Sequence, residues 1–199
     1  TFVDQDKVES IYYFIFMNLR IFLLGLSFFY LSPMIGQNKI KWTSWDLAQE
    51  KIQKSNKKFI IYFYYDGCKW CRFMEENTFA NDQLARFVNQ NFYTFRINAE
   101  STEKITLNNK SYSSVRVGKY DFHELAVDLL NGYMSFPAVA FMDEKFTKIQ
   151  SYDGFIELED FEMLLAFYAG DHYKNTRWKR YENNYCKESH FNSLVKDRK

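Results

Sequence analysis

Residues 58–76 read KFIIYFYYDGCKWCRFMEE, and this stretch decides the fold. Residues 59–65 form a continuous apolar run of strand length between Lys58 and Asp66, typical of a strand buried on both faces of a sheet. Good helix formers follow the two cysteines, Cys68 and Cys71. The stretch therefore predicts a buried strand, a Cys-x-x-Cys pair at the junction, and then a helix.

The rest of the chain continues this alternation of helices and strands. Asn81 suits the N-cap of a second helix, in which Leu84, Phe87 and Val88 line one face. Residues 104–115 predict a hairpin around Asn108 and Asn109, or an irregular insertion. The other expected elements are a helix at 43–56, a strand at 92–100, a helix at 121–133 closed by Gly132, two strands within 138–152 joined by a polar turn at 143–145, and a helix at 157–168. This order predicts an α/β fold with a central mixed sheet flanked by helices.

The composition is that of a soluble globular domain and gives no indication of a strongly charged partner. The chain has 199 residues with a formal net charge of +1, so neither nucleic acid nor an acidic substrate is expected. The run HYKNTRWKRYENNY at 172–185 carries basic and aromatic residues, but the balanced charge favours a solvated C-terminal helix packed by its aromatics. We expect no nucleic-acid partner.

Residues 17–37, MNLRIFLLGLSFFYLSPMIGQ, have the pattern of a secretory signal peptide. A Met, a segment with Arg20, an apolar stretch and helix breakers follow in order, with Met17 as the expected start. The alternative is a membrane anchor over 11–35, which would place Arg20 inside the bilayer at roughly 2.5–3.5 kcal/mol. The expected division is a signal region at 1–36, one domain at 42–170 and a C-terminal extension at 171–199. Both alternatives place the domain outside the cytoplasm, where disulfides form.

The position of the cysteine pair favours redox chemistry. At a helix N-terminus the free N–H groups and the helix dipole lower the pKa of the first thiol, here Cys68, and Lys69 adds a positive charge. Cys71 then lies close enough to attack a mixed disulfide and release the product. Pro137, the only proline after Pro33, stands directly before the strand at 138, where proline needs a special geometry such as a cis peptide bond.

FIIYFYYDGCKWCRFMEE, followed by SFPAVAFMDE and then YDGF, resembles the thioredoxin-like superfamily, and the sequence after the cysteines resembles an exported bacterial branch of it. The resemblance covers residues 42–170. It implies that Cys68 is the nucleophile, Cys71 the resolving thiol, and Pro137 a cis-proline that, with Phe136, holds the substrate strand.

The implied activity is reduction or interchange of disulfides in protein or peptide substrates. The redox-active disulfide needs no dissociable cofactor, and an electron-donating partner protein would reduce it again. The implied location is the periplasm or cell envelope, with membrane attachment only if the N-terminal segment is uncleaved. Exposed aromatics such as Trp70 would give an apolar landing surface for the substrate, although the same residues also suit a core.

Three features depart from the family pattern: the residue six before the first Cys, the residue directly before it, and the pair between the cysteines, which is Lys69-Trp70 rather than Gly-Pro. Thioredoxins usually carry a buried Asp six residues before the first Cys as proton acceptor for the resolving thiol, and here Tyr62 stands there. Tyrosine is a poor base at neutral pH because its ordinary pKa is about 10. Asp66, Glu75 or water are the remaining candidates. Gly67 replaces the Trp that normally precedes the first Cys.

Other interpretations of the cysteines remain open. The pair could be a structural disulfide, the fold could be a non-catalytic binding or assembly module, or Cys186 and His190 could complete a zinc site with the pair. The gap in sequence and the exported context disfavour zinc, so we expect no metal. His123 is expected at a helix start rather than in catalysis.

Overall fold

The computed structural model describes residues 38–54, 56–107 and 109–185, which belong to one compact unit. In chain order the elements are the 3₁₀ turn η1 (Trp45–Leu47), α2 (Ala48–Lys54), β1 (Lys58–Tyr64), α3 (Lys69–Met74), the π-helical turn η2 (Glu75–Phe79), α4 (Asp82–Asn91), β2 (Phe92–Asn98), β3 (Ile105–Leu107), β4 (Lys110–Tyr112), β5 (Ser114–Val117), β6 (Tyr120–His123), α5 (Glu124–Leu129), β7 (Ala138–Met142), β8 (Lys148–Asp153), α6 (Leu158–Ala169), the 3₁₀ turn η3 (His172–Lys174) and α7 (Trp178–Asn184). The expected signal region and Cys186 and His190 lie outside the described residues.

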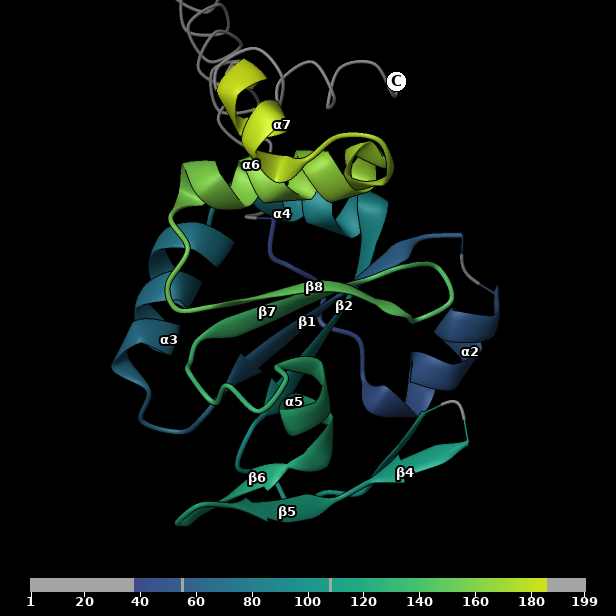
Figure 1. The fold of residues 1–199 in the computed structure, drawn as a ribbon, viewed down its shortest axis with the longest axis vertical. Helices are drawn as coiled ribbons and strands as arrows, with labels where there is room; N and C mark the ends of the chain where they lie inside the picture. The colour runs from purple at the N-terminus through teal and green to yellow at the C-terminus, as the bar shows by residue number, and fades with distance from the viewer. Residues whose placement is uncertain (1–37, 55, 108, 186–199) are drawn as a thin grey trace, which may run out of the picture. The chain divides into compact units, whose positions relative to one another are not determined.

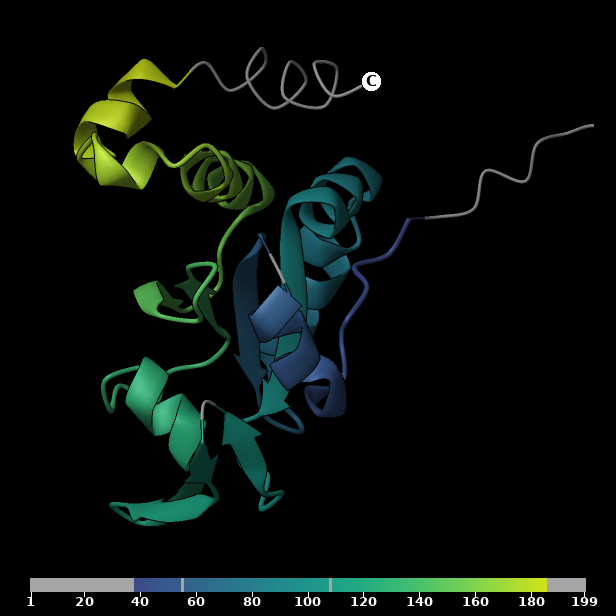
Figure 2. The same cartoon turned by 90° about the vertical axis from the view of Figure 1, so that its right-hand side faces the viewer.

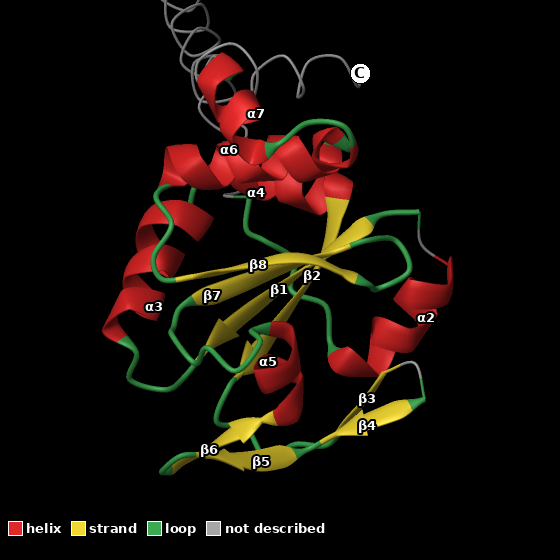
Figure 3. Cartoon of the chain, viewed as in Figure 1, coloured by secondary structure: helices red, strands yellow, loops and turns green. Residues whose placement is uncertain are grey.

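The central sheet has the strand order β2-β1-β7-β8 (Figures 1 and 3). β1 pairs in parallel with β2 and antiparallel with β7, so both of its edges are occupied. Residues 59–63 are all buried and apolar, because an internal strand covered on both faces buries its side chains on either side. The predicted buried strand and mixed sheet are confirmed.

Helices cover both faces of the sheet, and successive β1 side chains divide between them. Ile60 and Tyr62 point into a core formed with α3, α4 and α6, whereas Phe59, Ile61 and Phe63 point into a second core with α2, α5 and β3. α4 and α6 lie on one side of the sheet, and α5 and the short hairpins lie on the other (Figures 1 and 2). The alternation of strand side chains thus fixes a three-layer α/β/α arrangement.

Two hairpins stand between β2 and α5, and the sequence predicted only the first. β3 pairs with β4 at the expected place, and β5 pairs with β6 directly after it. The helix expected from Asp121 begins only at Glu124, because residues 120–123 form the second strand of this hairpin. Tyr120 and Phe122 favour a strand, and Gly118, at φ 63°, allows the tight turn before them. The same helix ends at Leu129 rather than near Gly132.

The predicted Asn81 cap and the C-terminal helix are confirmed. The Asn81 side chain accepts hydrogen bonds from the main-chain N–H groups of Gln83 and Leu84, and α4 buries the expected face. After α6, the aromatic side chains of α7 pack back onto that helix, with the Tyr181 ring 4.8 Å from the Phe167 ring. Within residues 38–185, apart from the two gaps, we find no helix with the length and apolar character that crossing a bilayer requires.

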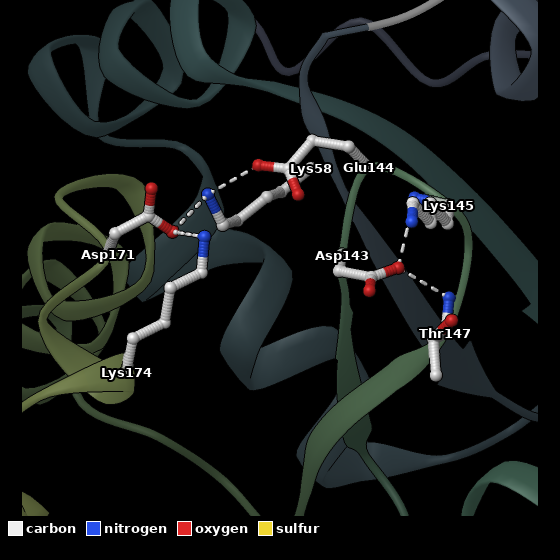
Figure 4. Close-up of polar contacts among 7 residues, drawn as sticks. All are labelled: Lys58, Asp143, Glu144, Lys145, Thr147, Asp171 and Lys174. Atoms are coloured by element: carbon white, nitrogen blue, oxygen red, sulfur yellow. Dashed lines mark hydrogen bonds and ion pairs between the residues drawn. The ribbon is translucent and has the colours of Figure 1, made fainter.

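A buried lysine ties three distant segments together at one end of the sheet (Figure 4). Lys58 Nζ lies 2.8 Å from Glu144 Oε1 and 2.8 Å from Asp171 Oδ1, and Lys174 Nζ lies 2.9 Å from the same Asp171 oxygen. Nearby, Asp143 Oδ1 accepts main-chain hydrogen bonds that hold the predicted polar turn between β7 and β8. The start of β1, this turn and the segment after α6 therefore share one ionic cluster.

His123 is a structural residue, as expected, and it makes stability depend on pH. Its side chain is fully buried, Nδ1 accepts from the Leu125 N–H as the N-cap of α5, and Nε2 lies 3.0 Å from the Glu103 carbonyl oxygen. Burial lowers the pKa of His123, so the folded state holds it neutral. Its contribution is therefore complete above the unfolded pKa of about 6.5 and falls as the pH drops from there toward the lower folded pKa.

We predict that the unfolding free energy of the wild type falls more steeply between pH 7.5 and 5.5 than that of His123→Asn. Asn keeps the N-cap function but does not titrate. Urea unfolding followed by circular dichroism at a series of pH values measures the difference. Parallel curves for the two proteins would contradict this role.

Candidate active site

Cys68 and Cys71 form a disulfide at the start of α3. Cys68 is the N-cap residue, and its Sγ accepts a hydrogen bond from the Cys71 N–H at 3.1 Å. Both side chains are nearly buried, at 6% and 3% exposed. Gly67, which departs from the family pattern, has φ 84° in the turn before the pair, a conformation that a Trp side chain would disfavour.

The loop before β7 lies beside the tyrosine that precedes the cysteine turn. The Phe136–Pro137 peptide bond is cis, the geometry that the resemblance implies. The Pro137 carbonyl accepts from the Gly154 N–H at 2.8 Å, and the Phe136 ring centre is 5.8 Å from that of Tyr65. Within the described residues, the main-chain N–H and C=O groups of Phe136 enter no main-chain hydrogen bond.

Trp70 belongs to an exposed aromatic patch rather than to the core. It is 61% exposed and contacts Phe73, itself 45% exposed, and the half-buried Phe155. Phe73 and Phe155 also contact each other, with ring centres 5.0 Å apart. We call Trp70, Phe73 and Phe155 the aromatic patch. Lys69, the other residue between the cysteines, is exposed beside it.

Tyr62 is buried behind the second cysteine. It is fully buried, and its hydroxyl donates to the Cys71 carbonyl oxygen at 3.2 Å. Burial raises the pKa of this hydroxyl far above its usual value, and the nearby Glu75 carboxylate adds to the rise. Tyr62 therefore stays protonated and is not a base at neutral pH. Glu75 is in turn paired with Arg96, whose Nη2 lies 3.6 Å from Glu75 Oε1.

The structure thus brings Cys68, Cys71, Tyr62 and Trp70 together around the start of α3, with Phe136 and Pro137 on the adjoining loop. Three further residues of this region, Phe73, Phe155 and Arg96, were not predicted. Phe73 follows Trp70 at helical spacing, which was an available signal. Phe155 and Arg96 reach the region only through the packing of β8 and β2, which no local pattern shows.

Metal ligation finds no support among the residues that the structure describes, where no group of three His, Cys, Asp or Glu side chains is placed to hold an ion. The zinc alternative also needs Cys186 and His190, which are outside those residues.

A four-stranded mixed sheet between helices, a Cys-x-x-Cys disulfide at the start of a helix and a cis-proline loop before the next strand define a thioredoxin-fold protein. Residues 45–169 match the model of the thioredoxin-like domain family, and the chain belongs to this family.

The matched relatives share only part of their length with this chain. Spermatogenesis-associated protein 20 is 34% identical in mouse and 32% identical in human over 73 residues, which is 35% of this chain and 9% of either protein. Among solved structures, a thioredoxin-fold protein from Helicobacter pylori has a TM-score of 0.48 at 14% identity, covering 71% of this chain and 81% of that one. A structure described as DsbH oxidoreductase has a TM-score of 0.43 at 16% identity, covering 62% and 82%.

Proposed function

We propose that this domain is an exported thiol–disulfide oxidoreductase that reduces or interchanges disulfides in protein substrates. The observation that carries the proposal is the Cys68–Cys71 disulfide at the first turn of α3. The Cys68–Cys71 disulfide closes a loop with only two intervening residues, and so small a loop adds little to the stability of the fold. This argues against a purely structural disulfide. The positive end of the helix dipole stabilises the thiolate of the first cysteine, which is its nucleophilic form.

The reaction is a pair of exchanges. In the reduced protein, the Cys68 thiolate attacks one sulfur of a substrate disulfide, and the substrate S–S bond breaks as a Cys68–substrate bond forms. Cys71, as thiolate, then attacks Cys68 Sγ and expels the second substrate sulfur. The substrate gains two electrons and two protons, and the protein is left with the Cys68–Cys71 disulfide. A partner dithiol protein reduces the pair for the next cycle.

The surroundings of the disulfide support a polypeptide substrate. The main-chain groups of Phe136 can pair with an extended segment, as the resemblance implies for a cis-proline loop. The aromatic patch offers apolar area beside the cysteines, and apolar side chains are what an unfolded substrate exposes. Export is supported by the N-terminal sequence pattern alone, and N-terminal sequencing of the protein from its source cells tests it: a start well before residue 30 would contradict cleavage.

Reduction of insulin tests the activity. The full chain, kept reduced by a low concentration of dithiothreitol, should precipitate the insulin B chain well above the dithiothreitol background. The Cys68→Ser/Cys71→Ser double variant, which retains Cys186, should match that background. Equal rates for the two proteins would refute the oxidoreductase proposal.

A further inference from the structure

Exposed apolar side chains gather on the segments that adjoin the disulfide. Among the described residues, five large apolar side chains are exposed, and one such side chain by itself needs no explanation on a protein surface. Four of the five, however, belong to α3, to the loop before β7 and to the β5–β6 hairpin: Trp70, Phe73, Tyr133 and Tyr120. Trp70 and Phe73 are members of the aromatic patch. Tyr120, which is 65% exposed, lies on the hairpin, an element that has no part in the exchange of disulfides itself.

A row of aromatic rings connects this hairpin to the cis-proline loop. The centre of the Phe122 ring lies 6.0 Å from that of Phe136 and 6.1 Å from that of Tyr120. Phe136 in turn contacts Tyr65, which precedes the cysteine turn. Tyr120 and Phe122 are two residues apart on β6, so their side chains project from the same face of the strand. Because Phe122 is only 9% exposed, it supports the rings on either side of it, and the row ends at the exposed Tyr120.

The hairpin is fixed across its own strands and to the rest of the domain. Arg116 Nε lies 2.7 Å from Asp121 Oδ1, and these two residues are direct partners across β5 and β6. At the base of the hairpin, the His123 N–H donates to the carbonyl oxygen of Ala99, the residue directly after β2, at 2.7 Å. Binding of a flexible partner costs less free energy when the surface that receives it is already ordered. The hairpin therefore presents a preformed surface beside the cis-proline loop.

We propose that the β5–β6 hairpin is a docking surface for the polypeptide substrate, with Tyr120 as a specificity-determining residue; this inference rests on the proposed oxidoreductase function. Because the aromatic row begins beside the disulfide, the partner that covers it is the chain that carries the reacting cysteine. One extended segment of that chain runs from Cys68 across Phe136 to the hairpin. The two ring-to-ring steps from Phe136 to Tyr120 measure 6.0 and 6.1 Å, a span that an extended chain covers in roughly four residues. An apolar side chain at that distance from the substrate cysteine packs against the Tyr120 ring.

The first test compares a polypeptide substrate with a small disulfide. In Tyr120→Ser, kcat/KM for the reduction of insulin should fall about fivefold through a rise in KM, which is the effect of losing one aromatic contact. Reduction of hydroxyethyl disulfide, which is too small to reach from Cys68 to the hairpin, should proceed at the wild-type rate. Tyr120→Phe keeps the ring and should retain the wild-type value for insulin.

Leu47→Ser is the matched control for this comparison. Leu47 is also an exposed apolar residue, at 46%, but it lies on η1, directly before α2. Figure 1 shows α2 and α3 on opposite sides of the domain. Both substrates should therefore be reduced by Leu47→Ser as they are by the wild type.

The second test locates the contact and needs no turnover. Labelled peptides of Gly, Ser and Thr, with serine in place of the reacting cysteine, carry one Phe four residues before or after that serine. Their binding to the oxidised full chain is followed by fluorescence polarisation. The wild type should bind one of these peptides about fivefold more tightly than the same peptide without Phe, and Tyr120→Ser should bind all of them alike.

The outcomes separate the docking surface from the reaction. No preference for Phe in the wild type, a preference retained in Tyr120→Ser, or an equal loss for insulin and hydroxyethyl disulfide would overturn the role of the hairpin while leaving the oxidoreductase function intact. If the wild type reduces neither disulfide, the proposed function fails, and peptide binding alone then decides whether the hairpin receives a polypeptide.

Discussion

Cys71→Ser should remain covalently joined to its substrate, whereas Cys68→Ser should form no such complex. Once Cys68 has attacked a substrate disulfide, Cys71 is the one cysteine of the described residues that is placed to displace the substrate, since its main-chain N–H directly contacts Cys68 Sγ. A serine hydroxyl does not form an attacking anion at neutral pH. The mixed disulfide therefore persists, and the reaction stops after the first thiol–disulfide exchange.

The amount of covalent adduct is measured by mixing each reduced variant with insulin and separating the products on a non-reducing gel. The Cys71→Ser adduct should carry an insulin chain on Cys68, located by mass spectrometry, and should dissolve on addition of dithiothreitol. Both variants are made in a Cys186→Ser background so that the third cysteine cannot contribute. An adduct of equal amount in Cys68→Ser, or none in either protein, would contradict the assigned order of attack.

Much of the fold follows from local patterns in the sequence. β1 was predictable because a strand buried on both faces reads as a continuous apolar run, here from Phe59 onward. The start of α4 was predictable because Asn81 satisfies the first free N–H groups of that helix without help from distant residues. The second hairpin was not, because a four-residue strand such as β6 owes its conformation to pairing with β5.

The candidate site likewise contains residues that local sequence patterns predict and residues that only the tertiary structure brings to the site. Cys68, Cys71 and Pro137 were predictable because each stands at a fixed place relative to a strand or helix of its own segment. The ion pair between Glu75 and Arg96 was not, since it forms only when β2 brings Arg96 opposite Tyr62. The exposure of Trp70 was also undecided by the sequence, because an aromatic side chain after a buried strand suits both core and surface.

Lys58→Met should destabilise the domain by roughly 2 kcal/mol, although methionine is an apolar residue placed at a buried position. Burial opposes the charged form of Lys58, but the hydrogen bonds and charges of Asp171 and Glu144 outweigh it and raise the pKa of the amine. Met keeps the packing of the side-chain stem and removes the charge. The two carboxylates then remain close together without the cation between them. Because both are partly exposed, at 34% and 45%, the loss should be smaller than for a fully buried pair.

Lys174→Met is the matched control, because Lys174 contacts the same Asp171 oxygen from an exposed position, with half of its side chain accessible. Its loss should cost less than about 0.5 kcal/mol, as for most exposed pairs. Urea unfolding at pH 7, with the disulfide formed in every sample, measures both changes. Equal losses, or a stabilised Lys58→Met, would mean that the cost of burying Lys58 exceeds the gain from its partners. A large and specific loss would instead show that this one amine holds β1, the β7–β8 turn and the segment after α6 together, because each of these supplies a member of the cluster.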